Sequence, residues 1–161
     1  MLIWILLWLV AMAFVLGVIF GAPYLPTRQK QSIAAIKLLG LKKGQTVVDL
    51  GSGDGSFLIE AAKQGIRGMG YEINPLLVLY SRFATARYSK LITIKWANFW
   101  YQDLSKFDGV YVFLIGRYMK KLDKKLTNEL KKGSKVASYT FKIPGRKVKR
   151  EEQGVYLYQY N

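Results

Sequence analysis

The sequence predicts an α/β fold in which a mostly parallel sheet carries helices on both faces, preceded by one N-terminal transmembrane helix. Three observations support this prediction. Short β-rich runs alternate with helical patterns along residues 28–161, a glycine-rich turn joins a strand to a helix, and residues 2–20 form an apolar run. Repeated strand–helix units are typical of a parallel sheet covered by helices.

The N-terminal segment predicts a membrane anchor. No Asp, Glu, Lys or Arg occurs between Met1 and Thr27, and residues 2–20 are all apolar apart from Gly17. As a helix, this run would span roughly 28 Å, close to the thickness of the hydrocarbon core of a bilayer. We therefore expect a transmembrane anchor at residues 1–21 and one domain at residues 22–161.

The charges next to the apolar run predict its orientation. Arg28, Lys30 and Lys37 follow the run, whereas only the α-amino group precedes it. The positive-inside rule then places the N-terminus outside and the domain in the cytoplasm, or on the matrix side of an organellar membrane. A cleaved signal peptide is disfavoured because no basic region precedes the run.

The elements of the domain have local sequence signals. Gly65 is suited to end a helix, and Asn74 and Pro75 supply an N-cap and a first helical position. Leucines spaced four residues apart predict an amphipathic last helix with its lysines facing outward. Helices are expected at Gln29–Leu39, Ser56–Gln64, Asn74 to about Ala86, and Lys120–Lys131. Strands are expected at Thr46–Leu50, Arg67–Tyr71, Leu91–Trp96, Val110–Ile115 and Lys135–Phe141, with Val155–Tyr160 as a terminal antiparallel strand.

The composition excludes several kinds of chemistry. The 161 residues include no Cys and no His, which excludes disulfides, thiolate or imidazole zinc sites, cysteine nucleophiles and Ser-His-Asp relays. The chain has 25 Lys and Arg against 10 Asp and Glu, a net charge of +15. This charge predicts an anionic partner, either nucleic acid or acidic lipid.

The sharpest signal is the run VVDLGSGDG at residues 47–55, a strand that ends in a glycine-rich turn and opens a helix. Glycines in such a turn adopt positive φ and let the backbone approach a ligand closely. Glu72 ends the next strand, 21 positions after Gly51, where a carboxylate can accept hydrogen bonds from ribose hydroxyls. A tight turn without a ligand is the alternative.

Two cofactor classes use this layout, and the charges separate them. A dinucleotide site needs a third small residue where the chain has Ser56, and Asp49 and Asp54 would repel a pyrophosphate. S-adenosylmethionine has no phosphate and carries a sulfonium and an ammonium group, so nearby carboxylates are tolerated. The spacing therefore favours S-adenosylmethionine.

The region from Ala22 to about Gln159 resembles the membrane-tethered seven-β-strand protein lysine methyltransferases, the family of the mitochondrial lysine methyltransferases that act on the ATP synthase c ring protein and on the adenine nucleotide translocase. The resemblance implies a Rossmann-like class I S-adenosylmethionine-dependent methyltransferase sheet. It also implies that a lysine of a membrane or membrane-associated protein accepts the methyl group. The matching segments are APYLPT at 22–27, DLGSGDG at 49–55, GYEINP at 70–75, YSR at 80–82, NFW at 98–100, and the leucines and charges of 122–130.

The site residues follow from the turn and the resemblance together. The turn residues shape the pocket for the methionine part of the cofactor, Asp49 orders the turn and receives the ammonium group, Glu72 holds the ribose and Asn98 reads the adenine edge. The resemblance places Thr27 near the carboxylate of the cofactor. The family commonly has Asp-Leu-Trp where this chain has Asn98-Phe99-Trp100. The turn residues are Gly51, Ser52, Gly53 and Gly55.

Aromatic residues provide candidate walls for an amine channel, since aromatic faces attract ammonium groups. These residues are Trp100, Tyr101 and Phe141, for which ordinary core packing is the alternative. No catalytic acid or base is predicted.

The segment Arg117–Glu152 has 13 Lys and Arg against 4 acidic residues. This excess is compatible with a solvated helix face, with contact to anionic lipid, or with RNA, although no RNA-recognition motif with stacking aromatics is visible. An RNA or small-molecule methyltransferase, and a non-catalytic cofactor-binding membrane scaffold, are the alternative functions.

Overall fold

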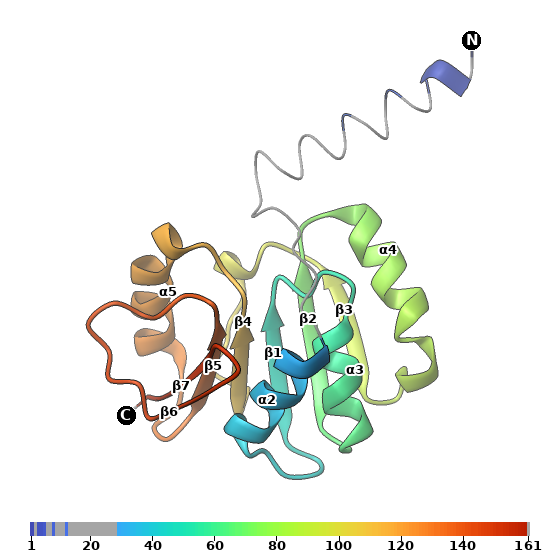
Figure 1. Ribbon diagram of the computed structural model, residues 1–161. Coiled ribbons are helices and arrows are strands. Elements are labelled where there is room, and N and C mark those ends of the chain that lie inside the picture. Colours follow the sequence, from blue (N-terminus) through green and yellow to red (C-terminus); the bar gives the residue numbers. More distant parts are fainter. Residues whose placement is uncertain (2, 6–7, 9–11, 13–28, 161) are drawn as a thin grey trace.

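The computed structural model describes residues 1, 3–5, 8, 12 and 29–160, and within them a seven-stranded sheet forms the centre of the domain (Figure 1). The strand order is β3-β2-β1-β4-β5-β7-β6. The pairs β1–β2, β2–β3, β1–β4 and β4–β5 are parallel, whereas β7 runs antiparallel to both β5 and β6. The strands are β1 (Thr46–Leu50), β2 (Arg67–Glu72), β3 (Ile92–Trp96), β4 (Gly109–Val112), β5 (Lys135–Tyr139), β6 (Arg150–Glu152) and β7 (Val155–Gln159).

Helices cover both faces of the sheet, as predicted. One hydrophobic cluster joins the sheet to the helices over residues 29–39, 56–63 and 75–84. The second joins the opposite face to the last helix through Met119, Leu122 and Leu126. Neighbouring residues of one strand point to opposite faces, so Val47 belongs to the first cluster and Val48 to the second. The helices are α2 (Gln29–Leu39), α3 (Ser56–Lys63), α4 (Pro75–Ala84) and α5 (Gly116–Glu129), with 3-10 turns η1 (Ala86–Tyr88) and η2 (Phe99–Tyr101).

Several predicted boundaries are confirmed. Helix α2 and strand β1 have the predicted bounds, and β7 is antiparallel as expected. The Asn74 side chain accepts hydrogen bonds from the backbone N–H groups of Leu76 and Leu77, at 2.9 and 3.5 Å, so it is the N-cap of α4.

Other predicted boundaries were wrong. Strand β4 ends at Val112 rather than Ile115, because its partners Leu50 and Ser138 are the last residues in register with it. Helix α5 begins at Gly116, four residues before Lys120, and ends at Glu129 rather than Lys131. Its N-cap position has no side-chain hydrogen bond and its first residue is a glycine, so no local signal marks the start.

The predicted transmembrane anchor lies almost entirely outside the described residues, as does Thr27. Among the described residues, no helix is long and apolar enough to cross a membrane.

Candidate cofactor site

The glycine-rich turn follows β1 at the carboxyl edge of the sheet. Gly51, Gly53 and Gly55 have φ of 95°, 52° and 81°, a region that side chains with a Cβ rarely adopt. The backbone N–H groups of Gly51 and Ser52 both donate to the Tyr71 carbonyl, at 2.9 and 3.0 Å. These bonds hold the turn against the end of β2, beside Glu72.

The Glu72 carboxylate connects three backbone segments. Its Oε2 accepts from the N–H of Gly53 at 2.9 Å, and its Oε1 accepts from the N–H groups of Ile73 and Asn74, both at 2.9 Å. The side chain is buried. A carboxylate has about four acceptor positions, so three bonds leave one acceptor position for a donor on a ligand. Glu72 therefore fixes the turn and retains capacity to bind a hydroxyl group.

Asp49 is a buried carboxylate without a cationic partner among the residues that the structure describes. It is 3% exposed, and no described residue donates a hydrogen bond to its side chain. Burial raises the pKa of Asp49 well above its ordinary value, and the negative charges of Glu72 and Asp54 raise it further. A positively charged ligand at this edge would relieve that repulsion. These carboxylates thus fit a cationic ligand and disfavour an anionic one.

Asn98 lies beyond the end of β3. Strands β2 and β3 pair Glu72 with Trp96, and the N–H of Ala97 donates to the Glu72 carbonyl at 2.9 Å. The Asn98 Oδ1 accepts from the N–H of Trp100 at 3.0 Å and caps η2. One lone pair of Oδ1 and the amide N–H groups are then left for a ligand.

The structure therefore brings the predicted residues of the turn, Asp49, Glu72 and Asn98 to one edge of the sheet. Ser52 is buried there, and its Oγ has no hydrogen-bond partner among the described residues.

The three aromatic residues predicted to line an amine channel differ in their surroundings. Trp100 is half-buried, with its ring 6.4 Å from that of Tyr118 in the first turn of α5, and the Lys121 ammonium lies 4.5 Å from the Trp100 ring. Phe141 also contacts this turn, since a Cβ at Gly116 would lie 3.1 Å from its ring. Tyr101 is 84% exposed and has no such contact with the described residues, so the structure does not place it beside the first turn of α5.

Sequence reasoning missed Tyr118 because it placed the start of α5 at Lys120. With the helix beginning at Gly116, Tyr118 lies in the first turn, which is the end of the helix nearest the carboxyl edge of the sheet.

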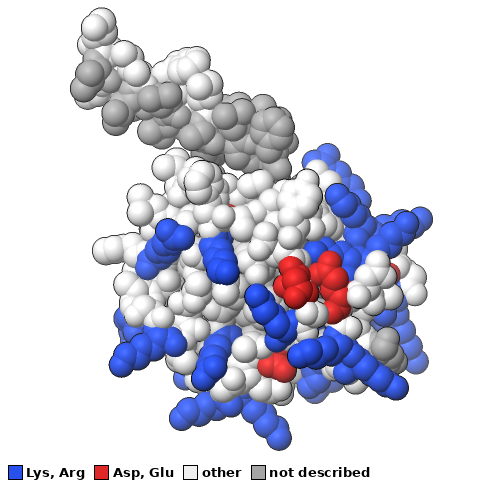
Figure 2. Space-filling model, turned by 180° about the vertical axis from the view of Figure 1, so that it is seen from behind, with Lys and Arg blue, Asp and Glu red and all other residues white. Residues whose placement is uncertain are grey.

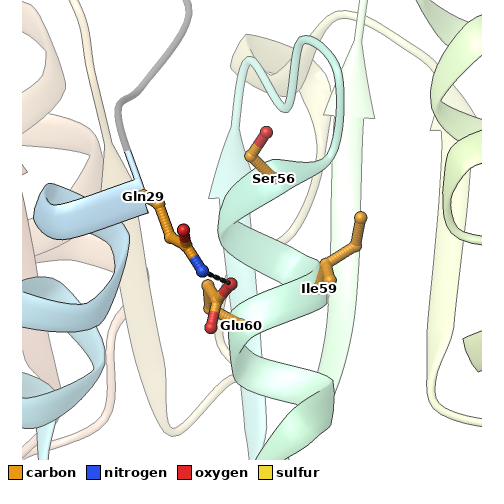
Figure 3. A pocket seen from close by; sticks show the side chains of 4 residues that line it. All are labelled: Gln29, Ser56, Ile59 and Glu60. Carbon is orange, nitrogen blue, oxygen red and sulfur yellow. Dashed lines mark hydrogen bonds between the residues drawn. The ribbon is translucent and has the colours of Figure 1, made fainter.

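A hollow of about 180 Å³ lies between the beginnings of α2 and α3, next to the turn (Figure 3). Gln29, Ser56, Ile59 and Glu60 line it. The Gln29 Nε2 donates to the Glu60 Oε1 at 3.1 Å, which joins the two helices across the hollow (Figure 3). Helix α2 thus begins at the same edge of the sheet as the glycine-rich turn.

The fold and the arrangement of the site are those of the class of methyltransferases that use S-adenosylmethionine. A family model described as the ANTKMT methyltransferase domain matches residues 49–150. The chain belongs to this family.

Three relatives illustrate the similarity. The protein-lysine N-methyltransferase of Saccharolobus islandicus (strain REY15A) is 34% identical over 151 residues, covering 84% of this chain and 92% of that protein. The adenine nucleotide translocase lysine N-methyltransferase of Mus musculus is 35% identical over 125 residues, covering 76% of this chain; the match spans 54%, about half, of its length. The crystal structure of an RNA methyltransferase from Salinibacter ruber in complex with S-adenosyl-L-homocysteine has a TM-score of 0.78 and 27% identity, covering 84% of this chain and 92% of that one.

Proposed function

We propose that this chain transfers a methyl group from S-adenosylmethionine to a lysine side chain of a membrane or membrane-associated protein. The observation that carries the proposal is the similarity to the Saccharolobus protein-lysine N-methyltransferase, which extends over 92% of that protein. The glycine-rich turn with its buried carboxylates supports the cofactor, and the apolar run at residues 2–20 supports the location of the substrate.

The site residues fit the cofactor by charge and hydrogen bonding. When bound, S-adenosylmethionine supplies a methyl group activated by a positively charged sulfur. Asp49 balances the positive charge of the ligand, Glu72 accepts hydrogen bonds from the ribose hydroxyls, and Asn98 binds the adenine edge. The resemblance adds Thr27 near the carboxylate of the methionine part. Gly51, Ser52, Gly53 and Gly55 form the wall of the pocket.

Replacing each of two of these glycines by alanine distinguishes an effect on fold stability from an effect on cofactor binding. At Gly55, a Cβ would lie 2.9 Å from the Thr85 Cγ2, and φ is 81°, so Gly55→Ala lowers the free energy of unfolding by about 2–4 kcal/mol. At Gly51, φ is 95° but no heavy atom lies within 4 Å of a Cβ, so Gly51→Ala costs only about 1–2 kcal/mol.

The space beside Gly51 is where the ligand approaches, so Gly51→Ala weakens S-adenosylmethionine binding more than its stability loss suggests. Urea unfolding and calorimetric titration of both variants measure the two effects. Equal losses of stability, or unchanged affinity in Gly51→Ala, would contradict this account of the turn.

The acceptor lysine must be neutral before its nitrogen can attack the methyl carbon. Desolvation lowers the pKa of a lysine, and aromatic faces attract ammonium groups. Trp100 and Phe141 border the first turn of α5 and can supply both, and the Trp100 ring already holds the Lys121 ammonium at 4.5 Å. The acceptor lysine would lose its proton to solvent, and the residues of the site would hold its nitrogen beside the methyl donor.

Replacing Trp100 tests this acceptor site, with the adjacent and largely exposed Tyr101 as the matched control. Trp100→Ala removes an aromatic wall and should lower kcat/KM for the protein substrate roughly tenfold or more, as expected for one lost cation–π contact with its packing. Tyr101→Ala should change it less than about twofold. Equal effects of the two changes on methyl-transfer rates would refute the assignment.

For the membrane, we propose a single-pass anchor at residues 1–21, with the N-terminus outside and domain 22–161 in the cytoplasm, or in the matrix if the membrane is organellar. Support comes from the charge-free run and from the basic residues that follow it. A reporter fused after Asn161 tests the orientation: activity on the cytoplasmic side agrees with it, and activity on the outer side contradicts it.

The basic C-terminal part supports contact with anionic lipid. Figure 2 shows Lys and Arg side chains spread over the back of the domain, with the acidic side chains confined to small patches. Lys120, Lys121 and Lys124 of α5 are exposed. Lys125 is not part of this outward face, contrary to the sequence-based expectation, because its Nζ donates to the Glu129 carboxylate and the Gln102 carbonyl at 2.6 and 2.7 Å.

RNA is the second candidate acceptor, favoured by the similarity to the Salinibacter RNA methyltransferase. The two candidates separate when labelled S-adenosylmethionine is incubated with the full chain and either host membranes or host RNA. Label that protease releases from membranes, with none in RNA, supports the protein acceptor. Label in RNA that nuclease removes would show that RNA, and not a protein, is the methyl acceptor.

A further inference from the structure

Helix α4 has an apolar outer face that no described residue covers. Only Val78 and Ser81 of this helix are buried, whereas Leu79 and Phe83 are 70% and 84% exposed. Soluble monomers rarely expose continuous apolar patches of this kind, and such patches usually mark interaction sites. We define the α4 apolar face as Leu76, Leu79, Tyr80 and Phe83, which lie on one side of the helix, with Ile73 and Trp96 at its N-terminal end.

Trp96 has the arrangement expected of a residue at a membrane interface. Its side chain is 66% exposed, while its indole N–H donates to the Ile73 carbonyl at 2.9 Å. The polar group of the indole is thus satisfied within the protein, and the apolar ring remains at the surface. Trp and Tyr are enriched where proteins meet the headgroup region of a bilayer.

The segment that carries this face has charged side chains of one sign only. Residues 73–102 contain no Asp or Glu but include Arg82, Arg87, Lys90 and Lys95. An apolar face on a segment with basic and no acidic side chains is complementary to an anionic bilayer. A second copy of the chain would instead bring like charges together, and such pairs repel.

The position of α4 relates this face to the cofactor site. A Cβ at Gly55 would lie 3.5 Å from the Ser81 Cβ and 2.9 Å from the Thr85 Cγ2, so the glycine-rich turn packs against the last part of α4. The first turns of the helix therefore extend past the carboxyl edge of the sheet, as Figure 1 shows. The upper left of Figure 2, on the side where Figure 1 places α4, is largely white.

We propose that the α4 apolar face inserts into the interfacial layer of an anionic bilayer and holds the carboxyl edge of the sheet, with the cofactor site, toward the membrane. This inference extends the proposed membrane location and does not depend on the methyl-transfer chemistry. It adds a specificity: the enzyme reaches acceptor amines that lie close to the headgroups.

The absence of cysteine makes a clean test possible. The full chain is prepared with one introduced cysteine, Leu79→Cys or the control Asn128→Cys, and each is labelled with an environment-sensitive NBD fluorophore. Asn128 is an exposed residue of α5 near its C-terminal end, and so near the opposite edge of the sheet. Both proteins are reconstituted into phosphatidylglycerol–phosphatidylcholine vesicles and isolated by flotation. Each is then exposed to nitroxide-labelled lipid and to a water-soluble quencher.

We expect the label at position 79 to show blue-shifted emission, to lose most of its fluorescence to the nitroxide lipid, and to be protected from the soluble quencher. The label at position 128 should show the reverse. Chains that float while both labels remain open to the soluble quencher would overturn the α4 contact and leave the anchor proposal standing. A label at position 79 protected from both quenchers would mean that protein covers the face, which also overturns the proposal. Chains that fail to float would overturn both.

Discussion

Replacing Glu72 by alanine is expected to weaken S-adenosylmethionine binding roughly 100-fold and to destabilise the ligand-free chain. The Glu72 carboxylate accepts three backbone hydrogen bonds, from Gly53, Ile73 and Asn74. Glu72→Ala leaves these donors without a partner at a buried position, which costs about 2–4 kcal/mol of unfolding free energy. The lost bonds to the ribose and the loosened turn together account for the change in affinity, at about 1.4 kcal/mol for each factor of ten.

The control is Glu72→Gln, which keeps the length of the side chain and one acceptor oxygen but removes the charge. Its effects on affinity and stability should both lie between those of the parent chain and Glu72→Ala. Calorimetric titration with S-adenosylmethionine and urea unfolding measure them. An affinity that is unchanged in Glu72→Ala would contradict the placement of the cofactor.

Replacing Asp49 by asparagine is expected to change stability and binding in opposite directions. In the ligand-free chain the Asp49 carboxylate is buried close to Glu72 and Asp54, which raises its pKa. At pH values above the raised pKa, where Asp49 is ionised, Asp49→Asn removes this unfavourable charge, so the ligand-free chain becomes more stable there. The same change removes the negative charge opposite the cationic cofactor, and binding should weaken about 10- to 100-fold, as expected for a charged hydrogen bond.

The pH dependence has a definite sign. The pKa of Asp49 is higher in the folded than in the unfolded chain, so the folded state retains a proton that the unfolded state loses. The contribution of Asp49 to stability therefore falls as the pH rises from its ordinary value of 3.8 through the raised value. Cofactor affinity rises over the same interval, because the carboxylate becomes charged. The difference between the parent chain and Asp49→Asn isolates both trends, and parallel profiles for the two proteins would refute the role of Asp49.

The sequence predicted the central fold well because its signals were local. The Val-rich strand Thr46–Leu50 and the Asn74-Pro75 helix start each combine a residue type with a backbone requirement. Strand β6 was missed because Arg150-Glu151-Glu152 has no β-pattern, and its pairing comes from the β7 hairpin. The pair Gln153-Gly154 is the sequence signal that could have revealed strand β6, because a glycine suits the positive φ of a hairpin turn; φ is 54° at Gln153 and 74° at Gly154.

The site was predictable to the level of residues on one edge of the sheet, and no further. The spacing of Gly51 and Glu72 placed them together, but the three bonds accepted by Glu72 depend on backbone positions that a pattern does not specify. Likewise, the sequence could not show that Trp100 is half-buried and the adjacent Tyr101 exposed, because that difference arises from the packing of α5.

The most direct test of the account is to transfer labelled methyl groups from S-adenosylmethionine to host membranes with the full chain, and then to hydrolyse the labelled protein to amino acids. Glu72→Ala serves as the inactive control. The account predicts that the label is recovered as methyl-lysine from a membrane or membrane-associated protein, and that the control yields far less. Label recovered in another amino acid, in lipid or in RNA, or none from chains shown to bind the cofactor, would contradict it.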